Sequence, residues 1–241
     1  MDVEITVNKR QAAEKAFGSG DYQLAKQIYE DLLHENPNNW EAFIFHSFST
    51  LLSKQVLNFK KDCNIAKDEF TEGVVLLRDS DVSRRDKALG VFRIFCGVEL
   101  LHELLLKKAA EQKEEKEKNN KKEAVVLYHE DVRIVYEFTA IICMILCDER
   151  DVDISLSRDV LLRVANKCLD YYGWEEGGKA TAPLLAIRKK VLDYKIQLGE
   201  DVVMELQRDK QRALAFNDRR IRRMVIEDFE ELLKKEESII N

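Results

Sequence analysis

The segment Gly173–Thr181 comes closest in this sequence to a catalytic motif. A phosphate-binding loop carries two glycines five positions apart, then a lysine, then a hydroxyl residue that holds the metal ion. The glycines and the lysine fit this pattern, but Ala180 takes the hydroxyl position and Thr181 comes one residue late. Glu175 and Glu176 would also repel a polyphosphate, and the segment follows a predicted helix rather than a strand. We therefore interpret it as a loop between helices, with nucleotide binding as the alternative.

Residue types that bind metal ions are present, but they lack the spacing that a site needs. His102 and His129 each precede a glutamate, as in a zinc-protease helix, yet neither has a second histidine where that motif requires one. Cys143 and Cys147 lie one helical turn apart, and no nearby histidine or second cysteine pair completes a tetrahedral site. The acidic run 148–153 lacks the glycine and the final glutamate of a calcium loop. The sequence predicts no metal, no cofactor and no enzymatic activity.

Positive charge is concentrated between residues 208 and 223, which is the strongest candidate for contact with nucleic acid. With Ile221 and Val225 facing inward, helical geometry turns the neighbouring arginines outward, where they could meet phosphates. The candidate phosphate contacts are Arg219, Arg220, Arg222 and Arg223. No aromatic residues stand between these arginines as stacking platforms, and an acidic run follows directly. A solvated helix face is the first interpretation, and a nucleic-acid-associated regulatory protein is the alternative.

The overall composition indicates a helical protein with a well-solvated surface. Apolar residues make up 45% and charged residues 35% of the chain, and only two prolines and nine glycines interrupt it. Such scarcity of chain breakers predicts long helices, and no segment shows the alternation that strands require. The formal net charge of −6 disfavours a protein whose main task is to coat nucleic acid.

The cysteines and the apolar stretches indicate the cellular compartment of the protein. The five cysteines are odd in number, scattered and set among apolar neighbours, which is typical of reduced thiols packed in a core. The first residues are acidic and lack the basic-then-apolar order of a signal peptide. The longest strongly apolar stretch, 138–147, has about half the length of a membrane span. We expect a cytoplasmic protein that does not enter a membrane.

The segment 7–53 predicts a helical hairpin followed by a third helix. Apolar spacing indicates helices over 7–19 and from Tyr22 to Asn36, with a turn at Gly20 between them. Pro37 stops the second helix, and Asn39 is a good N-cap for the next one.

The residues of this hairpin resemble a tetratricopeptide repeat (TPR). The resemblance rests on the run Phe17-Gly18-Ser19-Gly20-Asp21-Tyr22, followed by Ala25, Tyr29, Leu32 and Pro37. Small Ala13 and Ala25 allow two antiparallel helices to approach, while larger Phe17 fills the space beside them. The match covers residues 7–53, and the helix after Trp40 resembles the start of a second repeat. A TPR hairpin cannot bury its apolar face alone, so later helices must complete the stack.

The remaining chain predicts further helices without a clear repeat. One long helix is expected over 83–118, and 124–146 is apolar almost all round, as a central buried helix would be. We predict an all-α fold in which TPR-like hairpins at 1–80 are continued by a helical domain at 81–241. The charged segment 107–123 is expected to be a flexible hinge or a solvated extension. The whole is expected to form an irregular α-solenoid or helical array of about eight or nine helices.

The resemblance to TPR proteins implies a protein-interaction scaffold or adaptor. TPR hairpins present the inner face of their first helices to a peptide segment or a helix of another protein. On this chain the corresponding groove residues are Arg10, Glu14, Phe17, Glu41, Ile44 and Phe48. The alternative for Phe48 is that the following helices cover it. The sequence leaves the oligomeric state and the identity of the partner open.

Overall fold

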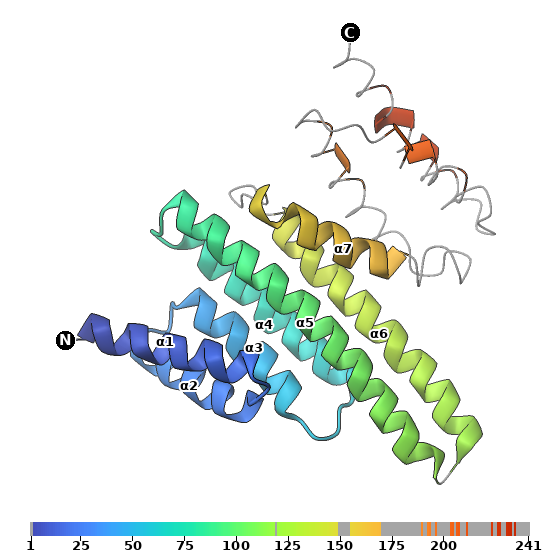
Figure 1. The fold of residues 1–241 in the computed structure, drawn as a ribbon, viewed down its shortest axis with the longest axis horizontal. Helices are drawn as coiled ribbons and strands as arrows, with labels where there is room; N and C mark the ends of the chain where they lie inside the picture. Colours follow the sequence, from blue (N-terminus) through green and yellow to red (C-terminus); the bar gives the residue numbers. More distant parts are fainter. Residues whose placement is uncertain are drawn as a thin grey trace. The chain divides into compact units, whose positions relative to one another are not determined.

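The structure, a computed structural model, describes residues 2–118, 120–148 and 155–169, together with individual residues between 189 and 234. Every regular element in this part of the chain is a helix, so the predicted all-α class is confirmed (Figure 1). The chain divides into two compact units, Met1–Leu156 and Ser157–Asn241. The TPR-like solenoid and the number of helices stay predictions.

The first unit consists of antiparallel helical hairpins. Its described helices are α1 (Asp2–Gly18), α2 (Tyr22–Glu35), α3 (Trp40–Ser53), α4 (Phe59–Asp79), α5 (Arg84–Glu117) and α6 (Lys121–Asp148). In the second unit the described helix is α7 (Arg158–Leu169), and a short 3-10 turn, η1 (Ser155–Ser157), crosses the boundary between the units.

The predicted domain boundary at residue 80 falls inside the first unit, in the turn between α4 and α5. The two helices that follow belong to this unit because α6 packs on α4 and α5 packs on α3. The charged segment 107–123 is helical as far as Glu117 and again from Lys121, and Ala109 within it is buried. The part of this segment up to Glu117 is continuous with α5, and its flexibility stays a prediction.

The first hairpin turns where the sequence predicts. Gly20 has a φ of +85°, a left-handed conformation that glycine adopts without steric cost. The carboxylate of Asp21 then accepts a hydrogen bond of 3.1 Å from the backbone N–H of Leu24, which caps α2. Ala13 and Ala25 are both fully buried in this hairpin, where their small side chains let α1 and α2 pack closely.

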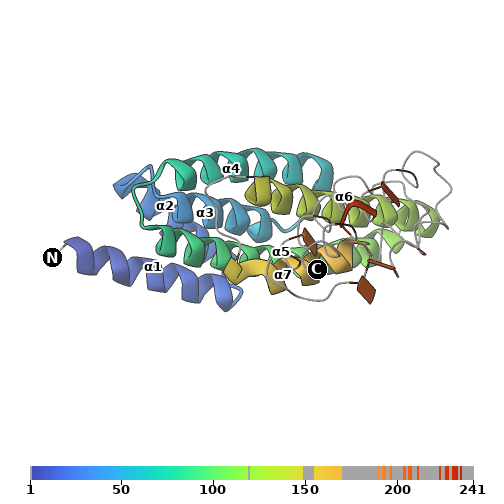
Figure 2. The same cartoon turned by 90° about the horizontal axis from the view of Figure 1, so that it is seen from above.

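The centre of the first unit is α3. Ten of its 14 residues are buried, and it packs against α2, α4 and α5. Figure 2 shows α3 lying between α4 and α5. The sequence predicts α6 as the central helix, but α6 exposes Val126, and its apolar residues instead cover one side of α4 and α5.

A chain of aromatic rings ties α3 to its neighbours. Phe17 of α1 meets Phe45 edge-on with centroids 5.4 Å apart, and Tyr29 of α2 lies 5.9 Å from the same ring. Phe45 meets Phe48 at 5.8 Å, and Phe48 stacks on Phe70 of α4 at 5.9 Å. Aromatic pairs at such distances stabilise a core beyond their buried area, so this chain of rings holds the four helices in register.

Glycines let the covering helices approach α3 closely. A Cβ atom on Gly73 of α4 would lie 2.5 Å from Cγ1 of Ile44, and one on Gly90 of α5 would overlap the ring of Trp40. Neither position has room for a side chain, so both glycines are required by packing rather than by backbone conformation.

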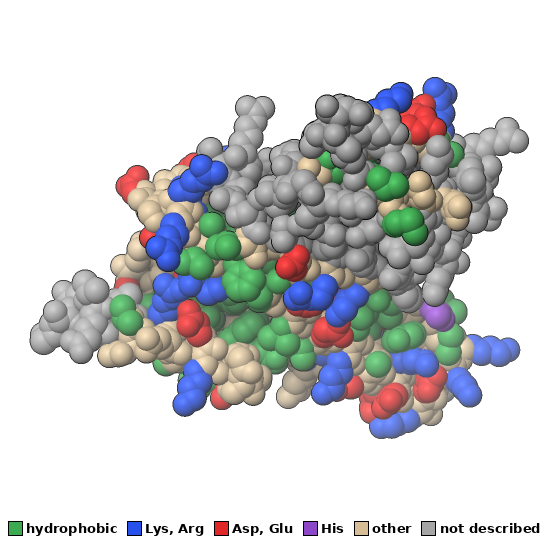
Figure 3. Space-filling model, turned by 45° about the horizontal axis from the view of Figure 1, so that its top comes forward, with side chains coloured by type: hydrophobic (Ala, Val, Ile, Leu, Met, Phe, Trp, Pro, Cys, Tyr) green, Lys and Arg blue, Asp and Glu red, His purple; other side chains and the backbone are tan. Residues whose placement is uncertain are grey.

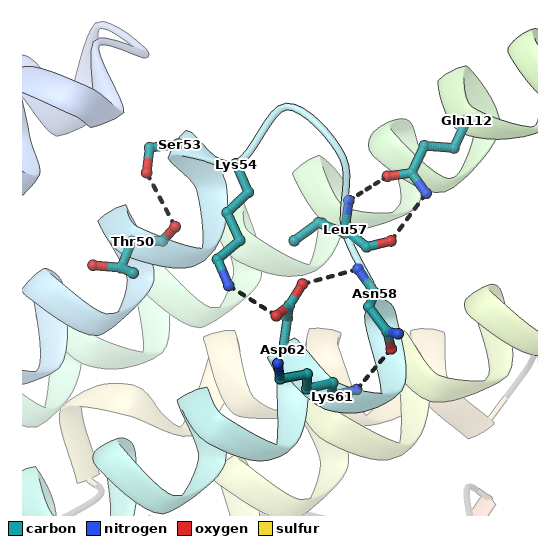
Figure 4. Close-up of polar contacts among 8 residues, drawn as sticks. All are labelled: Thr50, Ser53, Lys54, Leu57, Asn58, Lys61, Asp62 and Gln112. Atoms are coloured by element: carbon teal, nitrogen blue, oxygen red, sulfur yellow. Dashed lines mark hydrogen bonds and ion pairs between the residues drawn. The ribbon is translucent and has the colours of Figure 1, made fainter.

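Two side chains of α5 anchor the turn between α3 and α4. Lys108 donates a hydrogen bond of 2.8 Å to the carbonyl of Lys54, and Gln112 bonds the backbone of Leu57 (Figure 4). Gln112 accepts a hydrogen bond of 2.7 Å from the backbone N–H of Leu57 and donates one of 3.2 Å to its carbonyl. The carboxylate of Asp62 pairs with the Lys54 ammonium at 2.8 Å and accepts the backbone N–H of Asn58 at 2.9 Å. The backbone groups of Leu57 and the N–H of Asn58 are thus satisfied by side chains.

Removing the Gln112 anchor should destabilise the first unit. Gln112→Ala leaves the N–H and C=O of buried Leu57 without these two bonds, so we expect a loss of about 1–2 kcal/mol in unfolding free energy. Urea denaturation would measure the loss, with Gln27→Ala, at an exposed position of α2, as the control. Equal effects of the two substitutions would show that Gln112 does not anchor the turn.

The tight contact at Gly90 predicts a second loss of stability. Gly90→Ala should cost about 1–3 kcal/mol through overpacking against Trp40. Gly18→Ala is the matched control, because Gly18 is also helical and nothing lies within 4 Å of a Cβ there. The control accounts for the higher helix propensity of alanine. If both variants melt at the same temperature, α5 does not approach α3 as closely as the structure has it.

Candidate functional site

Three of the six residues predicted to line a groove lie in the core instead. Ile44 and Phe48 are fully buried, and Phe17 is also buried. Ile44 faces Gly73 of α4, and Phe48 stacks on Phe70 of the same helix. The exposure expected for these three residues is therefore not found, because neighbouring helices cover the apolar faces of α1 and α3.

The three polar residues of the predicted groove lie together at an ion-pair cluster. Arg10 of α1 pairs through Nε with Glu14, at 3.0 Å, and through Nη2 with Glu41 of α3, also at 3.0 Å. The side chain of Glu41 is only 10% exposed. It is positioned in the first turn of α3 by the Asn39 cap, an end of the helix that favours negative charge.

Arg93 of α5 completes this cluster. Its Nε lies 2.9 Å from Oε1 of Glu41, so one buried carboxylate joins α1, α3 and α5. Sequence reasoning misses Arg93, which stands alone in an apolar stretch of the helix. The one available signal is Glu41, an acidic residue on a helix predicted to be buried, because such a residue requires a cationic partner.

Burial dominates the electrostatics of Glu41. Removal from water raises the pKa of this carboxyl, and the nearby Glu14 adds to the rise. Arg10 and Arg93 act in the opposite direction but do not outweigh burial. The pKa of Tyr29, whose ring lies close by, is also raised, chiefly by burial and then by the charge of Glu41.

Beside the Glu41 cluster lies a cavity of about 750 Å³. Its walls come from α1, the turn between α2 and α3, the end of α4, and the first turns of α5. The hydrogen-bond donors in these walls include Arg10, Arg93, Asn36, Asn38 and Asn39. The side-chain oxygen of Asn36 accepts the N–H of Asn38, and that of Asn39 accepts the N–H of Ala42, each at 3.1 Å. The amide NH₂ groups of both asparagines therefore remain as donors.

The remaining walls of this cavity are apolar and acidic. Trp40, Leu76, Val82 and Leu89 supply apolar surface. The carboxylates of Asp79, Asp81 and Asp86 also line it. Asp79 is engaged by Arg78, and Asp86 accepts a hydrogen bond from the Ser83 hydroxyl. The arrangement suits a ligand that combines hydrogen-bond acceptors with apolar side chains, as a peptide segment does.

The predicted phosphate contacts lie almost entirely outside the described residues. Of the four arginines, the structure describes Arg223, whose side chain is 82% exposed and whose Nε donates to Glu227 at 2.7 Å. This i, i+4 pair fits the solvated helix face considered for the segment. Arg219, Arg220 and Arg222 lie outside the described residues, as does the glycine-containing loop 173–181.

The histidines and cysteines that could bind metal have structural surroundings where they are described. His102 is buried between α5 and α6, where its Nδ1 lies 3.0 Å from Oγ1 of Thr139 and its ring meets Tyr136 edge-on. Cys143 is buried, and the side chain of Cys147 lies outside the described residues. Within the described part of the chain, no group of three histidine, cysteine or acidic side chains could hold a metal ion.

Hydropathy gives one further result on the described helices. None of them combines the length and the apolar character needed to cross a membrane.

Comparisons with known proteins add no relative. No family model matches the chain, and neither curated proteins nor solved structures give a match. The candidate site therefore rests on the geometry around Glu41.

The raised pKa of Glu41 predicts a pH-dependent difference between the wild type and Glu41→Gln. The folded pKa lies above the unfolded value, so the buried carboxylate opposes folding at neutral pH, and this cost falls as the pH drops through the folded pKa. The variant keeps the shape of the side chain and removes its charge. We expect the unfolding free energy of the variant, minus that of the wild type, to be larger at neutral pH than at about pH 4.5.

Urea denaturation at the two pH values would measure this difference, and the subtraction removes the contribution of other titrating groups. A difference that grows on acidification would mean that Arg10 and Arg93 outweigh burial and stabilise the charged form of Glu41.

Proposed function

We propose that this chain is a protein-interaction scaffold that binds a peptide or a helix of another protein in the cavity beside Glu41. The observation that carries the proposal is the cavity of about 750 Å³, in which two arginines are oriented by a buried carboxylate next to apolar walls. Arginine held in place by ion pairs loses little freedom on binding, which favours it as an anchor at protein interfaces.

The resemblance to TPR proteins supports the same class of function. In this proposal α1–α2 and α3–α4 are TPR-like hairpins that α5–α6 continue into an irregular helical array, and the protein acts in the cytoplasm. The binding site differs from the groove that the resemblance implies. It keeps Arg10 and Glu41, gains Arg93, and leaves Ile44 and Phe48 in the core.

The lining of the cavity indicates the chemistry of the partner segment. The guanidinium groups and the asparagine amides would donate hydrogen bonds to backbone carbonyls or to an acidic side chain of the partner. Leu76 and Val82 would contact an apolar side chain. We therefore expect a short segment that carries both acidic and apolar residues.

A nucleic-acid-associated role through residues 208–223 stays the alternative. The described arginine of that segment, Arg223, is ion-paired with Glu227, so no described contact favours this alternative over the cavity.

Selection of binding peptides from a random peptide library displayed on phage would test the proposal, together with the affinity of cavity variants for the selected peptides. We expect enriched sequences to combine acidic and apolar residues. Their affinity should fall about tenfold or more in Val82→Asp, which places a negative charge at the cavity, and in Arg93→Gln, which removes a positive one. Fluorescence polarisation with synthetic peptides would give the dissociation constants.

Matched controls for this experiment lie on α6, away from the cavity. Val126 and Arg133 are exposed there, so Val126→Asp and Arg133→Gln should leave peptide binding unchanged. Thermal unfolding of every variant would separate lost binding from lost folding. Peptides that bind Val82→Asp and Arg93→Gln as tightly as the wild type would exclude this cavity as the site.

A further inference from the structure

The two arginines at the wall of the cavity share one carboxylate. Nη2 of Arg10 lies 3.0 Å from Oε2 of Glu41, and Nε of Arg93 lies 2.9 Å from Oε1 of the same residue. The arginine side chains are 41% and 40% exposed, whereas that of Glu41 is 10% exposed. A guanidinium group has five N–H donors, so each arginine can hold the buried carboxylate and still donate to a ligand in the cavity.

The charged groups around Glu41 act in both directions. Among the described residues, those that face it from the packed helices are Arg10 and Glu14 of α1, Tyr29 of α2 and Arg93 of α5. The end of α4, the turn after it and the start of α5 add three carboxylates to the cavity walls, Asp79, Asp81 and Asp86. Figure 3 shows a similar mixture on one face of the molecule, where positive and negative side chains lie side by side with hydrophobic side chains between them.

The two arginines keep Glu41 ionised against the effect of burial. Burial and the charge of Glu14 raise the pKa of the Glu41 carboxyl, and Arg10 and Arg93 oppose this rise. Tyr29 does not compete for a proton, because burial raises its pKa further away from neutral pH. The protonation state of Glu41 therefore depends on how fully the two guanidinium groups are available to it.

An acidic side chain of a bound segment would bring a second carboxylate to the same pair of arginines. Two carboxylates that share one site repel each other, and one of them then binds a proton at a higher pH than usual. The second carboxylate also offsets the positive charge that opposes the rise in the pKa of Glu41. Glu41 is buried and already raised in pKa, so it is the carboxyl that should take the proton.

We propose that binding of an acidic segment in this cavity is coupled to the uptake of a proton by Glu41. The inference rests on the proposed function, since it concerns the same cavity and the same arginines. The proton comes from the solvent and returns to it when the segment leaves, so the O–H bond of the carboxyl is the one covalent bond that forms and breaks. A protonated carboxyl keeps acceptor capacity for one arginine, so the cluster persists in the complex.

Coupling to proton uptake makes the affinity for the segment depend on pH. The affinity should rise on acidification between the pKa of Glu41 in the free chain and its higher pKa in the complex. Within this range, uptake of one full proton corresponds to about a tenfold gain in affinity for each unit by which the pH falls. Below the range Glu41 is protonated in both states, and the gain ends.

Calorimetry would count the protons. The probe is a peptide selected from the displayed library that contains an acidic residue and no histidine, titrated into the full chain at about pH 6, where a carboxylate in water is still ionised. Phosphate and imidazole buffers differ in ionisation enthalpy, so the difference in observed heat gives the protons taken up for each peptide bound. We expect about half a proton to one proton for the wild type.

Two variants assign the proton. Glu41→Gln cannot titrate at this position, so it should bind the peptide with close to no proton uptake. Glu137→Gln is the matched control, because Glu137 is an ion-paired glutamate on α6, away from the cavity, and this variant should take up as much as the wild type. Fluorescence polarisation gives a second readout, in which the affinity of the wild type should rise about three- to tenfold for each unit of acidification and that of Glu41→Gln should not.

The possible failures of this inference and of the proposed function are distinct. A peptide that binds the wild type without proton uptake would overturn the coupling and leave the cavity as the binding site. Uptake that persists in Glu41→Gln would assign the proton to another group, and loss of peptide binding in a folded Glu41→Gln would show that the charge of Glu41 is needed in the complex. Either result overturns the inference. A library that yields no peptide dependent on Arg93 would overturn the proposed function itself.

Discussion

The burial of α3 on three sides is the constraint on which the rest of the first unit depends. α3 is apolar around most of its circumference, so α2, α4 and α5 must all pack against it to remove its side chains from water. Helices with ordinary side chains pack with their axes 8–10 Å apart, and Gly73 and Gly90 allow α4 and α5 to meet the large side chains Ile44 and Trp40. The same packing closes the groove that Ile44 and Phe48 would otherwise line.

The burial of α3 also creates the polar cluster at its first turn. Glu41 is carried into the interior with the helix, and a buried carboxylate is stable only when cations and hydrogen bonds compensate for the lost water. Arg10 and Arg93 supply part of that compensation from α1 and α5, and their guanidinium groups are thereby held at the wall of a cavity. The feature that resolves an electrostatic problem of the fold is thus the feature that we propose for partner binding.

α5 contributes to both the core and the cavity. Its inner face packs against α3, and its N-terminal turns line the cavity.

Much of the local structure followed from the sequence alone. Short-range chemistry decides the turn at Gly20, the caps at Asp21 and Asn39, and the all-helical class, because each depends on residues only a few positions apart. Tertiary structure alone decided which apolar faces meet. The spacing of α3 shows that nearly every side is apolar, but not which neighbour covers which side. Arg93 and Glu41 are separated by 52 residues in the sequence, and Gln112 and Leu57 by 55. No local sequence pattern therefore predicts either contact. The candidate site is likewise decided by the tertiary structure, since it exists only where three helices bring their charged side chains together.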